Sequence, residues 1–485
     1  MANTLFTRVR GTSGNQSVQR YADATPGQVG DPLTPLLVAE NADTPNNRWP
    51  RNRTCQFRGN LYAMAEDGIY RKNDPSVLAG AWTNVETLTD RSTGVGAHAR
   101  SGIYVVDING VPNLACYHGT FNSAASRKGH TSPDGSAWAE TGTLLGPARI
   151  GIIDEIVYRN VIHYISQGGG TPEAGTYDPG SGTFSVVASP FVASKTTQGM
   201  CVFNDRLFAV YMIDNATVAL AEFTGGVWSL VPSTQITIAN NGNSVIAKHA
   251  LLTDGTNLYA FVPTTTGHGW KCYQYTGALG VPSDISTDVL PVGLLGSDDG
   301  GSFGGSSILA RCAATLDQNA DPTVGALSLW FAANGTLGTT LTQYNWIDNA
   351  TVITVQDSGG DVADAIPSGQ QQGGERIWTA GEMDCVILAR SAVLGGVELT
   401  LEFSGAVGPA DKTFDLYYGT DGEGAFAPAT LANPVTGGTA ALSGAGAGND
   451  VINIEANPAV VYTVVWNSGA DCQSGREQLK PRIRV

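Results

Sequence analysis

Charged residues are scarce in this chain of 485 residues: they make up 14% of it, against about 25% in a typical soluble domain. Long helices and coiled coils are rich in Glu, Lys and Arg, so this scarcity excludes them as the main architecture. No stretch approaches the 18 apolar residues of a membrane-spanning helix. Residues 1–8 hold no apolar segment of signal-peptide length, so we expect no secretion signal and synthesis in a reducing cytoplasm.

Patterns that bind metals or form disulfide frameworks are also missing. The seven cysteines are widely spaced and form no C-x-x-C pair, which argues against a zinc site or a dense set of disulfides. The six histidines form no metal-binding set, and His163 is expected to pack in a core or face a channel. The run Asp317-Gln318-Asn319-Ala320-Asp321 has Pro322 where a calcium loop needs glycine.

Nucleotide-binding and serine-hydrolase signatures do not occur. The chain contains neither G-x-x-x-x-G-K-[ST] nor G-x-S-x-G. Its 27 Lys and Arg against 43 Asp and Glu give a net charge of −16, which opposes non-specific binding to nucleic acid. We therefore predict a protein without enzyme activity, with no catalytic residue, no cofactor and no metal ion.

Glycine and apolar residues are abundant. There are 61 glycines, and 42% of the chain is hydrophobic, which suits many short strands joined by tight turns. One pattern recurs, a polar turn followed by a short apolar run with an aromatic residue near its start. The clearest copies are Arg58-Gly59-Asn60-Leu61-Tyr62, Asn204-Asp205-Arg206-Leu207-Phe208 and Gly255-Thr256-Asn257-Leu258-Tyr259.

The spacing of these copies predicts a β-propeller. Three looser copies surround Ile103, Ile162 and Leu329, and the six markers are 42, 59, 45, 51 and 71 residues apart. Propeller blades repeat every 40 to 50 residues or so. A second hairpin with an aromatic strand follows most markers, as expected for a four-stranded blade, which a large β-sandwich has no reason to repeat. The prediction is an all-β fold with six blades, five and seven remaining open.

The remaining segments differ in composition and predict the domain boundaries. Residues 1–47 are expected to form an extended N-terminal arm that supplies a strand to close the ring, and 48–347 the propeller. Residues 348–375 have the Gly-, Ser- and Gln-rich composition of a linker. Residues 376–485 contain about six or seven strand candidates, the size of a fibronectin-like or immunoglobulin-like β-sandwich.

One turn resembles the Asp-box of sialidase-like propellers. Ser132-Pro133-Asp134-Gly135-Ser136-Ala137-Trp138 matches that box except for one missing residue, and the role expected for Asp134 and Trp138 is structural. A sialidase would also need arginines that converge on a carboxylate. Its candidates are Arg48, Arg100, Arg149, Arg159, Arg206 and Arg311.

The architecture predicted for most of the chain resembles that of virion proteins of tailed bacteriophages. An acidic propeller followed by a small sandwich is similar to the nozzle or tail-hub proteins of short-tailed phages. The resemblance is carried by the blade copies around Leu61, Leu207 and Leu258 and by the turn at Asp134. It implies a structural virion subunit that forms a hexameric ring, contacts tail adaptor, fibre or portal-side proteins, and lets DNA pass without specific binding.

Two alternatives stay open. A glycan-binding propeller that recognises a receptor would use loop aromatics as stacking platforms, although aromatics at strand positions are more often blade core. The candidates are Trp82, Trp138, Trp228 and Trp270. The less favoured alternative is a sialidase-like glycoside hydrolase, which needs two carboxylates facing the propeller axis.

Overall fold

In the residues that it describes, the structure, a computed structural model, is all-β apart from one short helix, α1 (Ser286–Val289). It describes residues 4–10, 16–21, 29–30, 34–39, 55–64, 68–72, 83–88, 99–100, 102–119, 127–144, 152–166, 173–192, 197–214, 216–237, 250–253, 257–263, 270–289, 311–316, 327–332, 340–345, 350–356, 378–380, 383–393, 396–405, 413–420, 427–436, 441–442, 451–452, 460–468 and 477–484.

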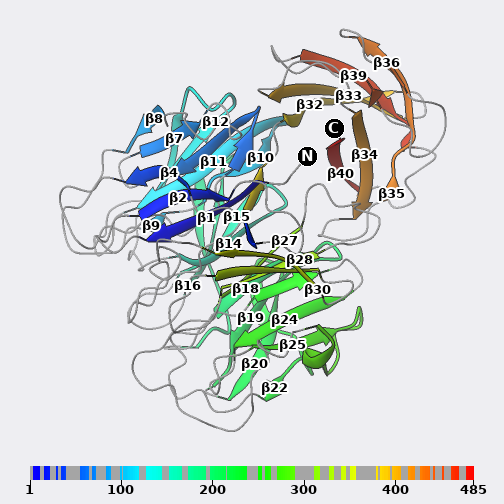
Figure 1. The fold of residues 1–485 in the computed structure, drawn as a ribbon. Helices are drawn as coiled ribbons and strands as arrows, with labels where there is room; N and C mark the ends of the chain where they lie inside the picture. Colours follow the sequence, from blue (N-terminus) through cyan, green and yellow to red (C-terminus); the bar gives the residue numbers. More distant parts are fainter. Residues whose placement is uncertain are drawn as a thin grey trace.

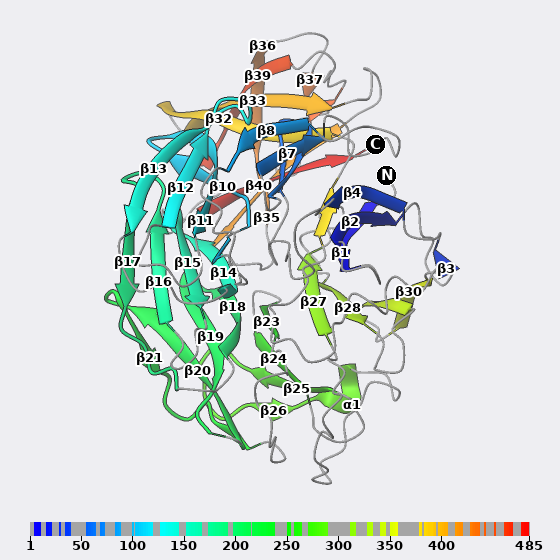
Figure 2. The ribbon, with the colours of Figure 1, turned by 90° about the vertical axis from the view of Figure 1, so that its left-hand side faces the viewer.

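Within these residues, seven sheets of four or five strands follow one another around a common centre, which makes the fold a β-propeller (Figure 2). Six sheets consist of strands consecutive in the chain. The first three are β5 (Cys55–Phe57), β6 (Asn60–Met64), β7 (Gly68–Lys72) and β8 (Thr83–Thr87); β9 (Ala99–Arg100), β10 (Tyr104–Ile108), β11 (Val111–Gly119), β12 (Arg127–Ser132) and β13 (Ala139–Leu144); and β14 (Ile152–Tyr158), β15 (Val161–Ser166), β16 (Glu173–Asp178) and β17 (Thr183–Val187).

The next three sheets continue the ring. They are β18 (Thr197–Phe203), β19 (Arg206–Met212), β20 (Thr217–Thr224), β21 (Val227–Leu230) and β22 (Ile236–Thr237); β23 (Ala250–Thr253), β24 (Leu258–Pro263), β25 (Trp270–Tyr275) and β26 (Ser283–Asp284); and β27 (Arg311–Leu316), β28 (Leu327–Ala332), β29 (Thr340–Asn345) and β30 (Ala350–Gln356), which β3 (Val29–Gly30) joins in parallel.

The second strands of the blades are apolar on both faces because each blade packs between two others. In β19, Leu207, Ala209 and Tyr211 join the core shared with the β14–β17 blade. Phe208, Val210 and Met212, which point to the opposite face, join the core shared with the β23–β26 blade. First strands of successive blades contact one another, as β14 and β18 do, so these strands line the centre of the ring.

The seventh sheet joins the two ends of the propeller sequence. It has the order β31–β1–β2–β4, from β1 (Thr4–Arg10), β2 (Gln16–Tyr21), β4 (Thr34–Ala39) and β31 (Trp378–Ala380). The sequence favoured six blades and left seven open, and the described residues place seven sheets in the ring. A sheet whose strands come from opposite ends of the chain leaves no repeat in the sequence, and the segment expected to be an extended arm holds three of its strands.

One of the six sequence markers lies in a different strand from the others. Leu61, Ile162, Leu207, Leu258 and Leu329 all lie in the second strand of a blade, whereas Ile103 directly precedes the first strand, β10. The true second strand of that blade is β11, which follows an Asn-Gly turn. The Asn-Gly turn fits the repeat, but β11 starts with Val-Pro-Asn and has no aromatic residue near its start. The sequence pattern therefore placed this copy at Ile103 instead.

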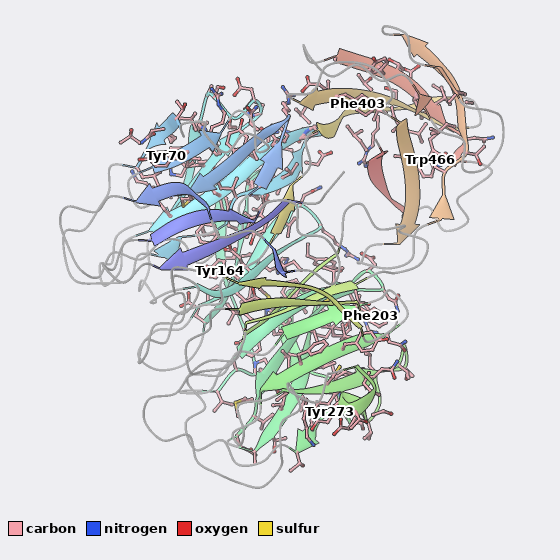
Figure 3. The ribbon with its side chains drawn as sticks, viewed as in Figure 1. Tyr70, Tyr164, Phe203, Tyr273, Phe403 and Trp466 are labelled. Atoms are coloured by element: carbon pink, nitrogen blue, oxygen red, sulfur yellow. The ribbon has the colours of Figure 1, made fainter. Side chains whose placement is uncertain are left out.

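The C-terminal residues form two further sheets beside the β5–β8 and β10–β13 blades (Figure 1). One is β32 (Met383–Val393), β33 (Gly396–Gly405), β39 (Val460–Trp466) and β36 (Leu431–Thr436); the other is β35 (Ala427–Pro428), β34 (Thr413–Thr420), β38 (Val451–Ile452), β37 (Ala441–Leu442) and β40 (Glu477–Arg484). Phe403 and Trp466 of the first sheet share one core with Leu416 of the second (Figure 3). The fibronectin-like or immunoglobulin-like sandwich topology stays a prediction.

The C-terminal sheets contact the propeller through β32 and β33. Leu388 of β32 packs against the hydrophobic cluster between the β5–β8 and β10–β13 blades. The Arg58 guanidinium lies 3.3 Å from a carboxylate oxygen of Glu402 in β33. The predicted domain boundaries near residues 47, 348 and 375 fall outside the described residues and stay predictions.

Candidate functional site

The turns between the first and second strands share one backbone geometry. Both central residues of four such turns have positive φ, as a type I′ hairpin requires. The pairs are Arg58 and Gly59, Asn109 and Gly110, Arg159 and Asn160, and Asn204 and Asp205. Because these turns occupy equivalent places in neighbouring blades, their polar side chains gather on one face of the ring.

Two of these turns meet across a blade junction. Arg159 Nη2 of the β14–β17 blade lies 2.6 Å from Asp205 Oδ2 of the β18–β21 blade. Beneath this pair, the Tyr158 hydroxyl donates to the Asp205 carbonyl at 2.7 Å, and the Arg159 guanidinium lies 4.9 Å from the centre of the Tyr158 ring. An ion pair, a hydrogen bond and a cation–π contact thus fix the two turns to each other.

A second arginine–carboxylate pair adjoins the first. Arg206 Nε and Nη2 donate to the two oxygens of Glu222 at 2.7 and 2.5 Å, a bidentate arrangement. Its guanidinium lies 5.0 Å from the centre of the Phe208 ring. The Arg159 and Arg206 side chains are 54% and 44% exposed, so both guanidinium groups face solvent although each has a carboxylate partner.

We call Tyr158, Arg159, Asp205, Arg206 and Glu222 the polar turn cluster. Buried and partly buried aromatic rings lie next to it. His163 lies 4.6 Å from Phe223, ring centre to ring centre, and burial lowers the pKa of this histidine to about 4. Its imidazole is therefore neutral at pH 7, so these neighbouring rings are uncharged. The prediction that His163 packs in a core is confirmed, because only 4% of the His163 surface is exposed to solvent.

The structure brings together two of the arginines that the sequence singled out. Arg159 and Arg206 flank Asp205, but each is neutralised by its own carboxylate, so they form no site for an anionic sugar. Arg100 and Arg311 lie in β9 and β27, where their side chains are not described, and Arg48 and Arg149 lie outside the described residues. The pairing with Asp205 and Glu222 could not be read from sequence spacing.

The aromatic candidates for glycan stacking that the structure describes are packed rather than exposed. Trp228 is 4% exposed and lies among Phe191 and Phe223. Trp138 packs against the cluster between the β5–β8 and β10–β13 blades. Trp82 and the side chain of Trp270 lie outside the part of the chain that the structure describes.

The turn at Asp134 has the structural role that its sequence predicts. Asp134 Oδ1 accepts hydrogen bonds from the backbone amides of Ser136 and Ala137 at 2.8 and 2.9 Å. These amides lower the pKa of the Asp134 carboxyl. The Ser132 hydroxyl accepts from the Gly135 amide, so the Ser132 and Asp134 side chains serve the turn itself.

Glu155 of β14 is a buried carboxyl with a strongly shifted pKa. Burial raises its pKa to about 7, while hydrogen bonds from the Gly102 amide and the Tyr117 hydroxyl act in the opposite direction. Its residue is 0% exposed, so the carboxyl has no contact with solvent. Among the described residues, no group of three or more His, Cys, Asp or Glu could hold a metal ion, and no helix is long and apolar enough to cross a membrane.

Comparisons with known proteins give matches in structure alone. Neither a protein-family model nor a curated protein sequence matches the chain. A six-bladed, fucose-recognising lectin of Aleuria aurantia is 14% identical with a TM-score of 0.34, over 65% of this chain and 95% of the lectin. A putative 6-phosphogluconolactonase of Bacteroides fragilis is 10% identical with a TM-score of 0.43, over 78% of this chain and 98% of that one. A functionally unknown protein of Desulfotomaculum acetoxidans is 12% identical with a TM-score of 0.43, over 78% and 99% of the two chains.

Proposed function

We propose that the chain is a non-enzymatic glycan-binding propeller and that the polar turn cluster binds a neutral carbohydrate. The observation that carries this proposal is the pair of exposed guanidinium groups, Arg159 and Arg206. Arg159 is matched by a carboxylate across a blade junction, and Arg206 by one on the next strand of its own blade. Sugar hydroxyls donate and accept hydrogen bonds, so they fit a surface on which planar donors and acceptors alternate.

The charge balance of the cluster favours a neutral ligand. Two guanidinium groups face two carboxylates, so an anion such as phosphate or a sialic acid carboxylate gains little net attraction there. Each guanidinium carries five N–H donors, more than one carboxylate accepts, which leaves capacity for ligand hydroxyls. The type I′ turns hold these groups in place before binding, which lowers the entropic cost of association.

Binding of neutral glycans by the full chain tests the proposal. A glycan array identifies the sugar, and titration calorimetry then compares the wild type with Arg206→Ala and Asp205→Asn. Asn accepts the positive φ of position 205, so the second variant removes charge without straining the turn. We expect each variant to weaken binding about tenfold or more while the melting temperature stays nearly unchanged.

A control variant uses another ion pair near the surface. Lys271 lies 3.1 Å from Asp284 in the β23–β26 blade, away from the cluster. Lys271→Ala should bind the same sugar with wild-type affinity. No array signal for any neutral glycan, or equal weakening by Lys271→Ala and Arg206→Ala, would contradict the proposal.

A further inference from the structure

Two histidines form a buried pair at the boundary of the β5–β8 and β10–β13 blades. His130 Nε2 lies 2.8 Å from His118 Nδ1, and the two rings stack with their centres 4.9 Å apart. The residues are 2% and 7% exposed. A hydrogen bond between two imidazoles needs one ring nitrogen with a free lone pair, so the pair cannot keep it when both rings are protonated.

Titratable and charged residues occupy the strand positions next to the pair. His130 Nδ1 lies 3.9 Å from Glu86 Oε1 of β8, and Glu140 of β13 is the register partner of His130. Lys128 of β12 and Arg100 of β9 are the register partners of His118. Burial and Glu140 raise the pKa of Glu86. Acid therefore also neutralises the Glu86 carboxylate, which lies near His130.

The pair adjoins the surface on which the C-terminal sheets dock. The Cα register partner of His130 is Cys116, which belongs to the cluster shared by the two blades. Phe57 and Ile69 contribute to that cluster from the β5–β8 blade, and Leu388 of β32 packs against it. We call this cluster with His118 and His130 the histidine seam. Opening the seam therefore removes part of the surface under β32.

We propose that the histidine seam is an acid-responsive joint, which opens when His118 and His130 become protonated and loosens the contact of the C-terminal sheets with the propeller. The inference is independent of the proposed glycan binding, because the polar turn cluster lies at a different blade junction.

The direction of the response follows from the burial of the pair. Burial lowers the pKa of His130 to about 4 in the closed seam, whereas an exposed histidine has a pKa of about 6.5. The closed seam is thus favoured in full above about pH 6.5 and is weakened as the pH falls toward 4. Each histidine that protonates only in the open state shifts the opening equilibrium by up to about tenfold per pH unit in this range.

Hydrogen exchange of the full chain, corrected for the intrinsic pH dependence of exchange, measures this opening. We compare pH 7.0 with pH 5.0 for peptides that contain β8, β12 and β32, in the wild type and in the His118→Gln/His130→Gln double variant. Two glutamines keep a side-chain hydrogen bond without titrating. In the wild type we expect acid to raise exchange about tenfold or more in all three peptides, and in the double variant to leave it nearly unchanged.

The third buried histidine of the described chain supplies the control. His163→Gln removes an imidazole from another blade junction and should leave the acid response of β8, β12 and β32 as in the wild type. If the double variant does not fold, His130→Gln alone should clearly reduce the pH dependence of exchange in these three peptides. An undiminished acid response in the glutamine variants would overturn the proposal, as would a response of β8 and β12 that β32 does not share.

Discussion

The carboxylates of Asp154 and Glu155, consecutive residues of β14, bond to the backbones of two different neighbouring blades. Asp154 Oδ2 accepts from the Met200 amide of β18 at 2.7 Å, and Glu155 Oε1 accepts from the Gly102 amide between β9 and β10. Both amides lie where the hydrogen-bond ladder is interrupted, Met200 at a register shift and Gly102 in the gap between two strands. The acidic pair therefore supplies acceptors that the sheets lack and links three blades near the centre of the ring.

Glu155→Gln should remove a pH-dependent loss of stability. The pKa of Glu155 is raised to about 7 in the folded protein, against an ordinary value near 4.5. A raised carboxyl pKa stabilises the folded state in full below about pH 4.5 and loses this effect as the pH rises to about 7. The full range corresponds to about 3 kcal/mol. Urea unfolding at pH 5 and pH 8 should show the wild type losing more stability on that rise than the variant.

A carboxylate of the same blade provides the control for this experiment. Glu173→Gln in β16 removes one negative charge without changing the acceptor of the Gly102 amide. It should retain the wild-type difference in stability between pH 5 and pH 8. If Glu155→Gln retains that difference as well, Glu155 is not the group that titrates.

Asp154→Ala should destabilise the protein, whereas Asp154→Asn should do so much less. Alanine leaves the Met200 amide without its acceptor, and an unsatisfied buried donor costs about 1–3 kcal/mol. Asparagine keeps a carbonyl oxygen at the same place. The free energies of unfolding of both variants, measured at pH 7 by chemical denaturation, check this expectation. Equal losses would show that the charge, rather than the acceptor, matters.

The blade pattern was predictable because a local turn produces it. A type I′ turn needs positive φ at two successive positions, so Gly, Asn and Asp recur there, and a second strand that packs on both faces must be apolar throughout. Strand candidates such as Val397–Phe403 and Val460–Trp466 were found from another local signal, in which apolar or β-branched residues recur at every second position. The seventh sheet has no such local signal, because its pairing of Leu5 with Thr379 joins distant parts of the chain.

The sites were less predictable than the strands because they depend on contacts between strands and between blades. Arg159 and Arg206 were identified as candidates, but their partners Asp205 and Glu222 become neighbours only through the hairpin turns and strand pairing. The predicted virion location, hexameric ring, virion partners and passage of DNA depend on other molecules and stay predictions. Mass measurement of the purified chain checks the ring directly, since a monomer would contradict it.

Trp228→Ala should affect stability rather than sugar binding. The indole is 4% exposed and packs with Phe191 and Phe223, so its removal creates a cavity in the core between two blades. Truncations of this kind cost about 3–5 kcal/mol. Chemical denaturation measures that loss, and calorimetry of the fraction that remains folded should give wild-type glycan affinity. Lost affinity with unchanged stability would instead support the prediction that Trp228 is a stacking platform.

Glycines inside strands have a role that their number alone did not reveal. A Cβ atom at Gly129 of β12 would overlap the Tyr177 hydroxyl, and one at Gly175 of β16 would overlap the Tyr164 ring. Both tyrosines are fully buried. Part of the high glycine content therefore makes room for tyrosine rings between and within blades, whereas the sequence pattern indicated only turns and linkers.

Gly135→Ala and Gly110→Ala separate the need for space from the need for positive φ. The two glycines have similar φ values, +73° and +82°. A Cβ atom at Gly135 would overlap the Tyr62 hydroxyl, whereas one at Gly110 meets nothing within 4 Å. Left-handed backbone costs an alanine about 1–2 kcal/mol, which is the whole effect expected at Gly110. At Gly135 the displacement of a fully buried tyrosine adds to this cost, so denaturation should show a clearly larger loss. Equal losses would mean that Tyr62 moves aside freely.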